Sequence, residues 1–107
     1  MSAKLRITFQ KVNEEDPGYQ WLNIELGEVR VGKARIKQYH SKIIIHTINI
    51  FPEFERKGFA KQTVDFLKEK VPEIIAERVR PTARGFWKHL DFYDTCDGNY
   101  RWVSSRK

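Results

Sequence analysis

The hydrophobic and polar residues of this chain follow two different periods, and the change falls near Gly58. In residues 4–10 apolar and polar positions alternate, which predicts a half-buried β-strand. Residues 43–50 are rich in isoleucine, a composition typical of a buried strand. In residues 59–71 the apolar positions recur every three or four residues, which predicts an amphipathic helix that ends before Pro72.

Two further strands are predicted in the first half of the chain. Residues 21–26 and 29–36 both have strand-like composition, and Gly27 and Glu28 between them form a tight turn, so the two strands should pair as a hairpin. Proline and glycine mark another turn at 14–18, and residues 39–42 form the turn before the isoleucine-rich strand. The first half is therefore predicted to be an antiparallel meander.

The second half should add a crossover and a second helix. Residues 74–79 are a short apolar run, and because a helix precedes them, this strand should lie parallel to residues 43–50 through a right-handed crossover. A second helix should begin at Pro81 with Thr82 as its N-cap, and a last strand should cover 100–104 after a loop at 94–99. The predicted fold is α/β (α+β), with a mixed, mostly antiparallel sheet and a central β-α-β crossover.

Length and composition limit the choices further. The 107 residues fit one domain, 1–107, and Cys96 is the only cysteine, so no internal disulfide can form. The chain has no apolar run near eighteen residues and no signal-peptide pattern, so we expect a cytoplasmic protein without a membrane span. The formal charge of +6 suits anionic ligands, from nucleotide-like phosphates to nucleic acid, without choosing among them.

The junction between the isoleucine-rich strand and the helix is a candidate anion site. The first N–H groups of a helix have no intrahelical partner and carry the positive end of the helix dipole, and Gly58 lets a phosphate approach closely. Arg56, Lys57 and Lys61 add positive charge. The alternative is a plain connection between a strand and a helix.

The order of these elements and four short motifs resemble the GNAT superfamily of acetyl-CoA-dependent N-acetyltransferases. In that family the central strand ends in a hydrophobic-x-hydrophobic-x-Pro pattern, followed by Q/R-x-x-G-x-G/A. Here residues 48–52 read INIFP, and residues 55–60 read ERKGFA, which matches the second motif at Gly58 and Ala60. The resemblance extends to residues 31–36 and 83–92 and spans about 20–104.

The resemblance implies a GNAT-like acyl-CoA N-acyltransferase fold, with acetyl-CoA as co-substrate. Backbone groups of Ile48 and Ile50 would pair with the pantetheine amides, as an added strand would. The pyrophosphate would lie on the N–H groups of the loop and first helical turn, namely Arg56, Lys57, Gly58, Phe59, Ala60 and Lys61. A bound amine would then attack the thioester directly, with one group acting as base and commonly a tyrosine protonating the thiolate.

The chain departs from the family pattern in four places. Glu55 replaces Gln or Arg in the loop, and Trp87, which has no transferable proton, stands where the tyrosine acid is usual. Asp91 replaces the glycine of a Gly-Phe pair. Where the family has two helices that shape the acceptor pocket, only residues 13–19 remain, so we expect an open acceptor side.

Three residues are candidates for the general base or the acid of this reaction. His46, on the central strand, could serve as general base; the alternative is an ordinary hydrogen-bonded histidine. Glu77 lies where some family members carry a base carboxylate, and otherwise it is a surface glutamate. Tyr93 could replace the missing acid if the backbone returns toward the cleft, or it packs as an aromatic residue. The histidines and the single cysteine lack metal-ligand spacing, so no metal site is expected.

Three functions remain open from the sequence. The first is transfer of an acetyl group to an amine, on a macromolecule or an exposed side chain of a protein, by a monomer or a homodimer. The second is a catalytically degenerate GNAT domain that binds acetyl-CoA or a protein partner as a regulator. The third is a basic nucleic-acid-binding module, with stacking aromatic residues Trp87 or Tyr93 and the cations Arg78, Arg80, Arg84 and Lys88.

Overall fold

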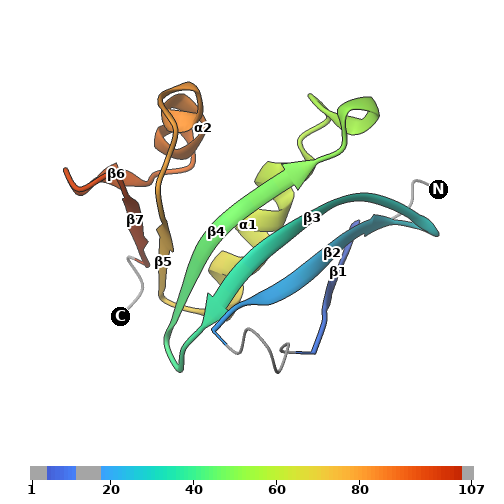
Figure 1. The fold of residues 1–107 in the computed structure, drawn as a ribbon, viewed down its shortest axis with the longest axis horizontal. Helices are drawn as coiled ribbons and strands as arrows, with labels where there is room; N and C mark the ends of the chain where they lie inside the picture. The colour runs from blue at the N-terminus through green and yellow to red at the C-terminus, as the bar shows by residue number, and fades with distance from the viewer. Residues whose placement is uncertain (1–4, 12–17, 105–107) are drawn as a thin grey trace.

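The computed structural model describes residues 5–11 and 18–104. Within these residues one mixed sheet contains seven strands in the order β1-β2-β3-β4-β5-β7-β6 (Figure 1). The elements, in chain order, are β1 (Leu5–Phe9), β2 (Gln20–Leu26), β3 (Val29–Gln38), β4 (Lys42–Ile50), the 3₁₀ turn η1 (Pro52–Phe54), α1 (Phe59–Lys70), β5 (Glu73–Ala76), the 3₁₀ turn η2 (Pro81–Ala83), α2 (Arg84–His89), β6 (Tyr93–Asp94) and β7 (Tyr100–Val103).

The strand pairing confirms the predicted mixed sheet. Strands β1 to β4 form an antiparallel meander, and β7 pairs antiparallel with both β5 and β6. Only β4 and β5 pair in parallel within the described chain, and α1 connects them. Above this short parallel ladder the two strands diverge (Figure 1).

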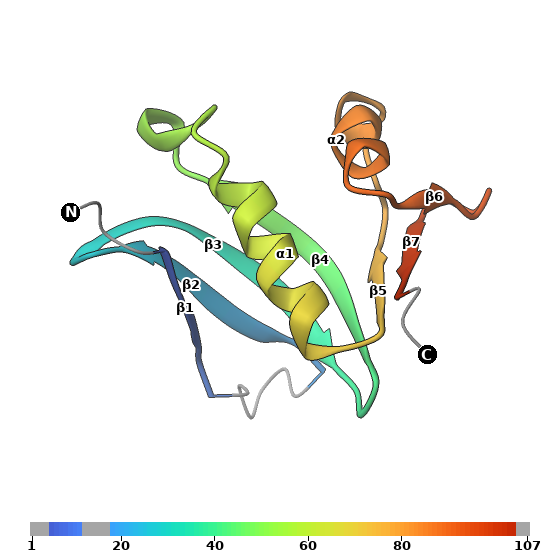
Figure 2. The same ribbon diagram turned by 180° about the vertical axis from the view of Figure 1, so that it is seen from behind.

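Both helices lie on the same face of the sheet (Figure 2). Val64 and Leu67 of α1 pack against inward-facing strand residues such as Leu22, Ala34 and Ile45, all of which are buried. Because side chains alternate along a strand, the residues between these face the other way. We call that second face, opposite α1, the outer face; in the described part of the chain no helix covers it.

Some boundaries differ from those predicted. Strand β5 ends at Ala76 rather than Val79, and β6 occupies part of the predicted 94–99 loop. The prediction that Thr82 caps the second helix is wrong: Thr82 lies inside η2, and no side chain caps α2. Pro81 begins the 3₁₀ turn η2, so Thr82 lies within this turn and Ala83 is the residue that directly precedes α2. Most of the predicted 14–18 turn lies outside the described residues.

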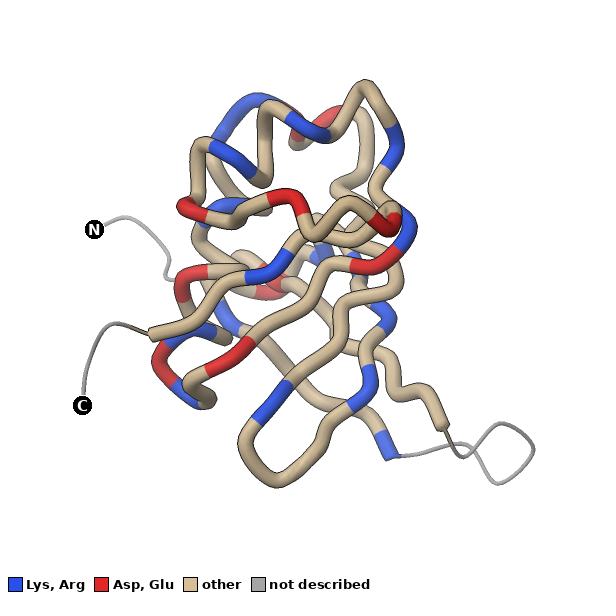
Figure 3. The backbone as a smooth tube through the Cα atoms, turned by 90° about the vertical axis from the view of Figure 1, so that its left-hand side faces the viewer, with Lys and Arg blue, Asp and Glu red and all other residues tan. Residues whose placement is uncertain are grey.

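Charged residues are spread over the whole fold. Lys and Arg lie along many elements and are interspersed with Asp and Glu (Figure 3). No helix in the described chain is long and apolar enough to cross a membrane. In the same residues no three His, Cys, Asp or Glu side chains lie close enough to hold a metal ion together.

Candidate active site

A β-bulge in β4 separates two halves of the central strand. On its first half Ile45 pairs with Ile36, and on its second half Thr47 pairs with the preceding β3 residue, Arg35. One step along β3 therefore matches two steps along β4, and His46 is the extra residue. A bulge changes the direction of the side chain at the extra residue and shifts the alternation of the strand that follows it.

The bulge shifts which residues of β4 direct their backbone groups away from β3. Before it, the Ile45 carbonyl accepts a hydrogen bond from the Glu77 N–H, so Ile45 directs its polar groups toward β5. After it, the Phe51 N–H donates to the Val31 carbonyl on β3, at 2.8 Å. Since neighbouring residues in a strand point their N–H and C=O groups to opposite sides, those of Ile48 and Ile50 point away from β3. The β4–β5 ladder ends at Ile45 and Ala76, before these residues are reached.

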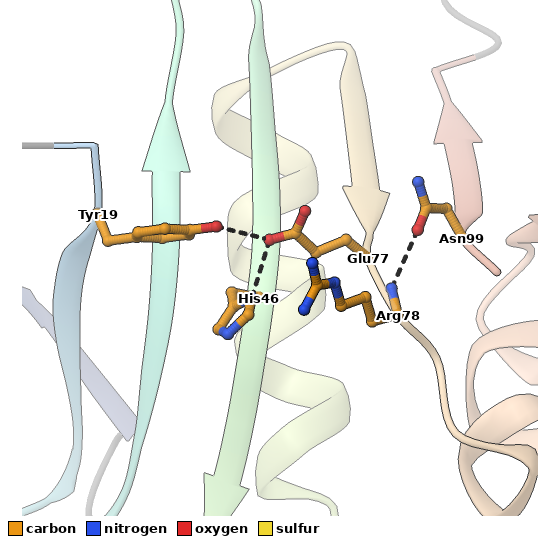
Figure 4. Close-up of polar contacts among 5 residues, drawn as sticks. All are labelled: Tyr19, His46, Glu77, Arg78 and Asn99. Carbon is orange, nitrogen blue, oxygen red and sulfur yellow. Dashed lines mark hydrogen bonds and ion pairs between the residues drawn. The ribbon is translucent and has the colours of Figure 1, made fainter. Parts of the chain in front are cut away.

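Three side chains from distant parts of the sequence meet where that ladder ends. The Glu77 Oε1 atom lies 2.9 Å from His46 Nδ1 and accepts a hydrogen bond from the Tyr19 hydroxyl at 3.0 Å (Figure 4). The Tyr19 and His46 rings are 5.1 Å apart. About a quarter of the His46 and Glu77 side chains is exposed, at 28% and 23%. The group is therefore held by hydrogen bonds and remains accessible from outside.

The environment of this cluster fixes the charge of its carboxylate. Burial by itself would raise the pKa of Glu77, but the hydrogen bonds from His46 and Tyr19, together with the charges of His46 and Arg78, lower that pKa below its ordinary value. Burial, followed by the hydrogen bond to Glu77, raises the pKa of Tyr19. At neutral pH Glu77 is thus ionised and Tyr19 keeps its proton.

An ionised Glu77 also determines the tautomer of His46. A carboxylate has no proton to give, so His46 Nδ1 must carry the hydrogen of their shared bond. In the neutral ring the Nε2 atom then has a free lone pair, and it points away from Glu77 (Figure 4). A histidine oriented by a carboxylate in this way can accept a proton at Nε2, and the carboxylate stabilises the resulting imidazolium.

The N-terminus of α1 has the geometry expected of an anion site. Gly58 precedes the helix with φ +82°, in the left-handed region, and the first intrahelical bond runs from the Gln62 N–H to its carbonyl. No acidic residue lies in the first turn and no side chain caps it. Of the nearby cations, Arg56 and Lys57 are exposed, whereas Lys61 pairs with Asp65 at 2.8 Å. Phe59 is buried and packs on the core rather than facing this end.

Two other sequence candidates lie elsewhere. Tyr93 is on β6, at the edge of the sheet beyond β7, where its hydroxyl accepts a hydrogen bond from Arg101; the structure does not bring it to His46. Trp87 is 7% exposed and stacks edge-on against Phe86 and Phe92. A ring buried in this way is not available to stack on nucleic-acid bases; of the two residues that the nucleic-acid hypothesis offers for stacking, Trp87 or Tyr93, Tyr93 is exposed.

Tyr19 is the member of the cluster that the sequence analysis missed. It precedes β2 and reaches Glu77 across a sequence separation of 58 residues. A tyrosine at the start of a strand gives no local sign of this contact, because the contact depends on the order of strands β2, β3 and β4 and on the bulge at His46.

Comparisons with known proteins agree with the fold and the sequence motifs. The family model described as "Acetyltransferase (GNAT) family" matches residues 2–92. No curated protein sequence matches the chain.

Three solved structures illustrate the similarity. An acetyltransferase from Thermus thermophilus is 19% identical, with a TM-score of 0.64 over 84% of this chain and 66% of that one. The Bacillus subtilis N-acetyltransferase YlbP, solved with coenzyme A, is 12% identical, with a TM-score of 0.70 over 94% and 97%. The putative N-acetyltransferase YhhK from E. coli, bound to coenzyme A, is 12% identical, with a TM-score of 0.74 over 94% and 99%. At these identities the structures support the fold, while the family model covers most of the sequence, so the chain belongs to the GNAT family of acetyltransferases.

Proposed function

We propose that the chain is an N-acetyltransferase that uses acetyl-CoA and transfers the acetyl group to an amine by direct attack on the thioester. The observation that carries this proposal is the His46–Glu77 pair, 2.9 Å apart, at the point where β4 and β5 stop pairing. YlbP and YhhK, which share the fold, were solved with coenzyme A, and this supports the choice of co-substrate.

The backbone around the diverging strands would hold acetyl-CoA. The N–H and C=O groups of Ile48 and Ile50 face away from β3, so the pantetheine amides can pair with them as a strand would. The uncapped first turn of α1 offers N–H groups and a positive dipole to the pyrophosphate, and the exposed Arg56 and Lys57 add charge. Glu55 is exposed in the same loop, and its negative charge would make pyrophosphate binding weaker than it would be with Gln or Arg at this position.

His46 supplies the acid–base chemistry in this proposal. The amine nitrogen forms a bond to the acetyl carbonyl carbon, and His46 Nε2 takes the proton that the nitrogen loses. Glu77 keeps Nδ1 protonated and stabilises the imidazolium. When the carbon–sulfur bond breaks, the imidazolium returns the proton to the thiolate of coenzyme A. No separate acid is then needed at the position of Trp87.

A second candidate is a regulator that binds acetyl-CoA without turnover. The observation that favours it is Trp87: the family commonly has its acid at this position, but the indole has no transferable proton and is packed in the core against Phe92. In this reading the His46–Glu77 pair only fastens β4 to β5.

Release of coenzyme A from acetyl-CoA, followed with a thiol reagent in the presence of polyamines, peptides and free amino acids, separates the two candidates. We expect amine-dependent release by the wild type, and a His46→Gln variant that loses about 10²–10⁴-fold in kcat/KM while its acetyl-CoA affinity by calorimetry stays the same. Binding without release for every amine would support the regulator. Equal release by both proteins would contradict the role of His46.

A further inference from the structure

Arg78 directly follows Glu77 and has an unusual backbone conformation. Its φ of +53° lies in the left-handed region, where glycine is the residue that fits with least strain. Two hydrogen bonds hold the chain there. The Arg78 N–H donates to Asn99 Oδ1 at 3.0 Å. The next N–H, that of Val79, donates to the Gly98 carbonyl at 2.8 Å. The chain therefore leaves the end of β5 through a fixed turn at Arg78.

This turn directs the Arg78 side chain toward the His46–Glu77 pair. In a regular strand consecutive side chains point to opposite faces, so Arg78 would point away from Glu77. The left-handed residue breaks this alternation, and in Figure 4 the Arg78 side chain extends alongside Glu77 toward β4. Burial has the largest effect on the pKa values of Glu77 and Tyr19, and the Arg78 charge acts on each in the downward direction. The guanidinium thus acts electrostatically on the cluster.

The guanidinium has no partner among the described residues. The Arg78 side chain is exposed, and in residues 5–11 and 18–104 it takes part in no ion pair and donates no hydrogen bond. Glu77, its neighbour in the chain, accepts its hydrogen bonds from His46 and Tyr19 instead. Strained backbone conformations of this kind are concentrated at functional sites. An arginine at a position that suits glycine points to a use of its side chain.

The position of this charge limits what it can bind during the reaction. His46 Nε2 is the proposed proton acceptor, so the amine nitrogen must lie beside the His46 ring. The Arg78 guanidinium is turned toward the same pair (Figure 4), so a group that it binds lies close to the reacting amine. A guanidinium is planar and binds a carboxylate through two parallel hydrogen bonds. A carboxylate close to an amine is therefore the chemical pattern that fits.

Acetyl-CoA does not bring an anion to this place. In the proposed arrangement its phosphates lie at the N-terminus of α1, and its pantetheine arm pairs with Ile48 and Ile50. The arm and the acetyl group that approach His46 are uncharged. The carboxylate that Arg78 binds must therefore belong to the acceptor.

We infer that Arg78 determines acceptor specificity by binding a carboxylate, and that the acceptor is a free α-amino acid. This inference rests on the proposed transferase function and adds the class of substrate. In an α-amino acid the amine and the carboxylate are attached to one carbon, so both groups reach the same small region. A lysine side chain in a protein has no carboxylate beside its amine, and the first residue of a peptide has an amide there.

The products of this reaction are an N-acetyl amino acid and coenzyme A. The neutral α-amino nitrogen forms a bond to the acetyl carbon, and the bond between that carbon and sulfur breaks. The proton that the nitrogen loses passes through His46 Nε2 to the thiolate. Arg78 holds the carboxylate throughout and exchanges no proton, because a guanidinium stays charged in proteins.

Coenzyme A release with the common free amino acids, each compared with its carboxamide, tests the inference. The amide keeps the amine and the side chain but has no negative charge. For the best amino acid, the wild-type preference for acid over amide in kcat/KM should fall about tenfold in Arg78→Gln, mainly through the KM of the amino acid. Arg80→Gln, a matched loss of charge two residues further on, should keep the preference. Acetyl-CoA affinity in calorimetry should be the same in all three proteins.

Arg78→Gly separates the side chain from the fold. Glycine fits φ +53° with less strain, so this variant should melt at or above the wild-type temperature and still lose the preference. A preference that survives Arg78→Gly overturns the inference. So does a weaker affinity for acetyl-CoA in Arg78→Gln, because this would assign Arg78 to the co-substrate.

A nuclear magnetic resonance titration keeps the inference distinct from the transferase proposal. The Nε–H signal of Arg78 should shift when the amino acid is added to the protein with coenzyme A, and should not shift with the amide. If this shift occurs but no amine receives an acetyl group, the carboxylate site stands and the transferase proposal fails. If other amines are acetylated and no free amino acid is, the transferase proposal stands and the amino acid acceptor is overturned.

Discussion

Replacing Glu77 by glutamine removes the negative charge of the acceptor that joins Tyr19 and His46, and leaves a neutral amide oxygen in its place. In the wild type one carboxylate oxygen takes hydrogen bonds of 3.0 Å and 2.9 Å from these two side chains. Bonds to a charged acceptor stabilise a fold by about 1.5–3 kcal/mol when buried, and the 23% exposure of Glu77 reduces this. We expect a loss of about 1–2 kcal/mol for the pair of bonds, or roughly 5–10 °C in melting temperature.

The pH dependence of this loss identifies its cause. Because the pKa of Glu77 is lowered in the folded protein, its contribution to stability is present above the ordinary value of 4.5 and is lost as the pH falls below it. The difference in melting temperature between wild type and Glu77→Gln should therefore shrink between pH 6 and pH 3, as measured by circular dichroism.

Glu73→Gln is the matched control for this experiment. Glu73 is the first residue of β5, the strand that ends just before Glu77; it is similarly exposed, at 26%, and accepts a hydrogen bond from Arg101 at 2.7 Å. The Arg101 side chain is 40% exposed, and an ion pair with one partner open to solvent in this way contributes about 0–1 kcal/mol, so this variant should melt closer to the wild type. Equal melting temperatures for Glu77→Gln and wild type at pH 7, or a difference that does not change with pH, would refute the reasoning.

Three further predictions test other parts of the structure. Gly58→Glu should abolish acetyl-CoA binding in calorimetry, since it adds negative charge in front of the uncapped helix. The control Gly58→Asn should keep most of the affinity, because asparagine tolerates φ +82°. Unchanged affinity in Gly58→Glu would place the site elsewhere. Gly32→Ala should destabilise the fold by about 1–3 kcal/mol in urea unfolding, because a Cβ there would lie 2.5 Å from the Asn49 carbonyl oxygen. Burial and Glu77 raise the pKa of the Tyr19 hydroxyl above 10.0, so ionisation of this hydroxyl at higher pH opposes folding. The wild type should therefore lose stability as the pH rises above 10, and Tyr19→Phe should remove the Tyr19 contribution to this loss. Identical alkaline melting curves for the two proteins would contradict this.

Much of the fold follows from local sequence patterns. Alternation predicts strand β1, the composition of residues 21–26 predicts β2, and the three- to four-residue period predicts α1 to within a residue of its end. The parallel pairing of β4 and β5 follows from the helix between them. These features are predictable because each depends on neighbouring residues or on a general rule of chain connection.

The candidate site depends on contacts that no local pattern contains. His46 and Glu77 could be named from the sequence, but their 2.9 Å contact requires the parallel register of β4 and β5. The bulge at His46 is a change of register between β3 and β4, and an isoleucine-rich run gives no sign of it. Tyr19 enters the cluster only because β2, β3 and β4 lie side by side. The failed Thr82 cap shows the same limit on a smaller scale, since one 3₁₀ turn moved the start of the helix.

A titration of the isotope-labelled protein with acetyl-CoA, followed by the chemical shifts of the backbone amides and of the histidine rings, tests the central claim most directly. We predict the largest changes at the amides of Ile48 and Ile50, at those of the first turn of α1, and in the ring of His46, because the co-substrate should lie between the diverging β4 and β5 and on the helix N-terminus. The absence of shifts, or shifts confined to α2 and the β6–β7 edge, would contradict the account.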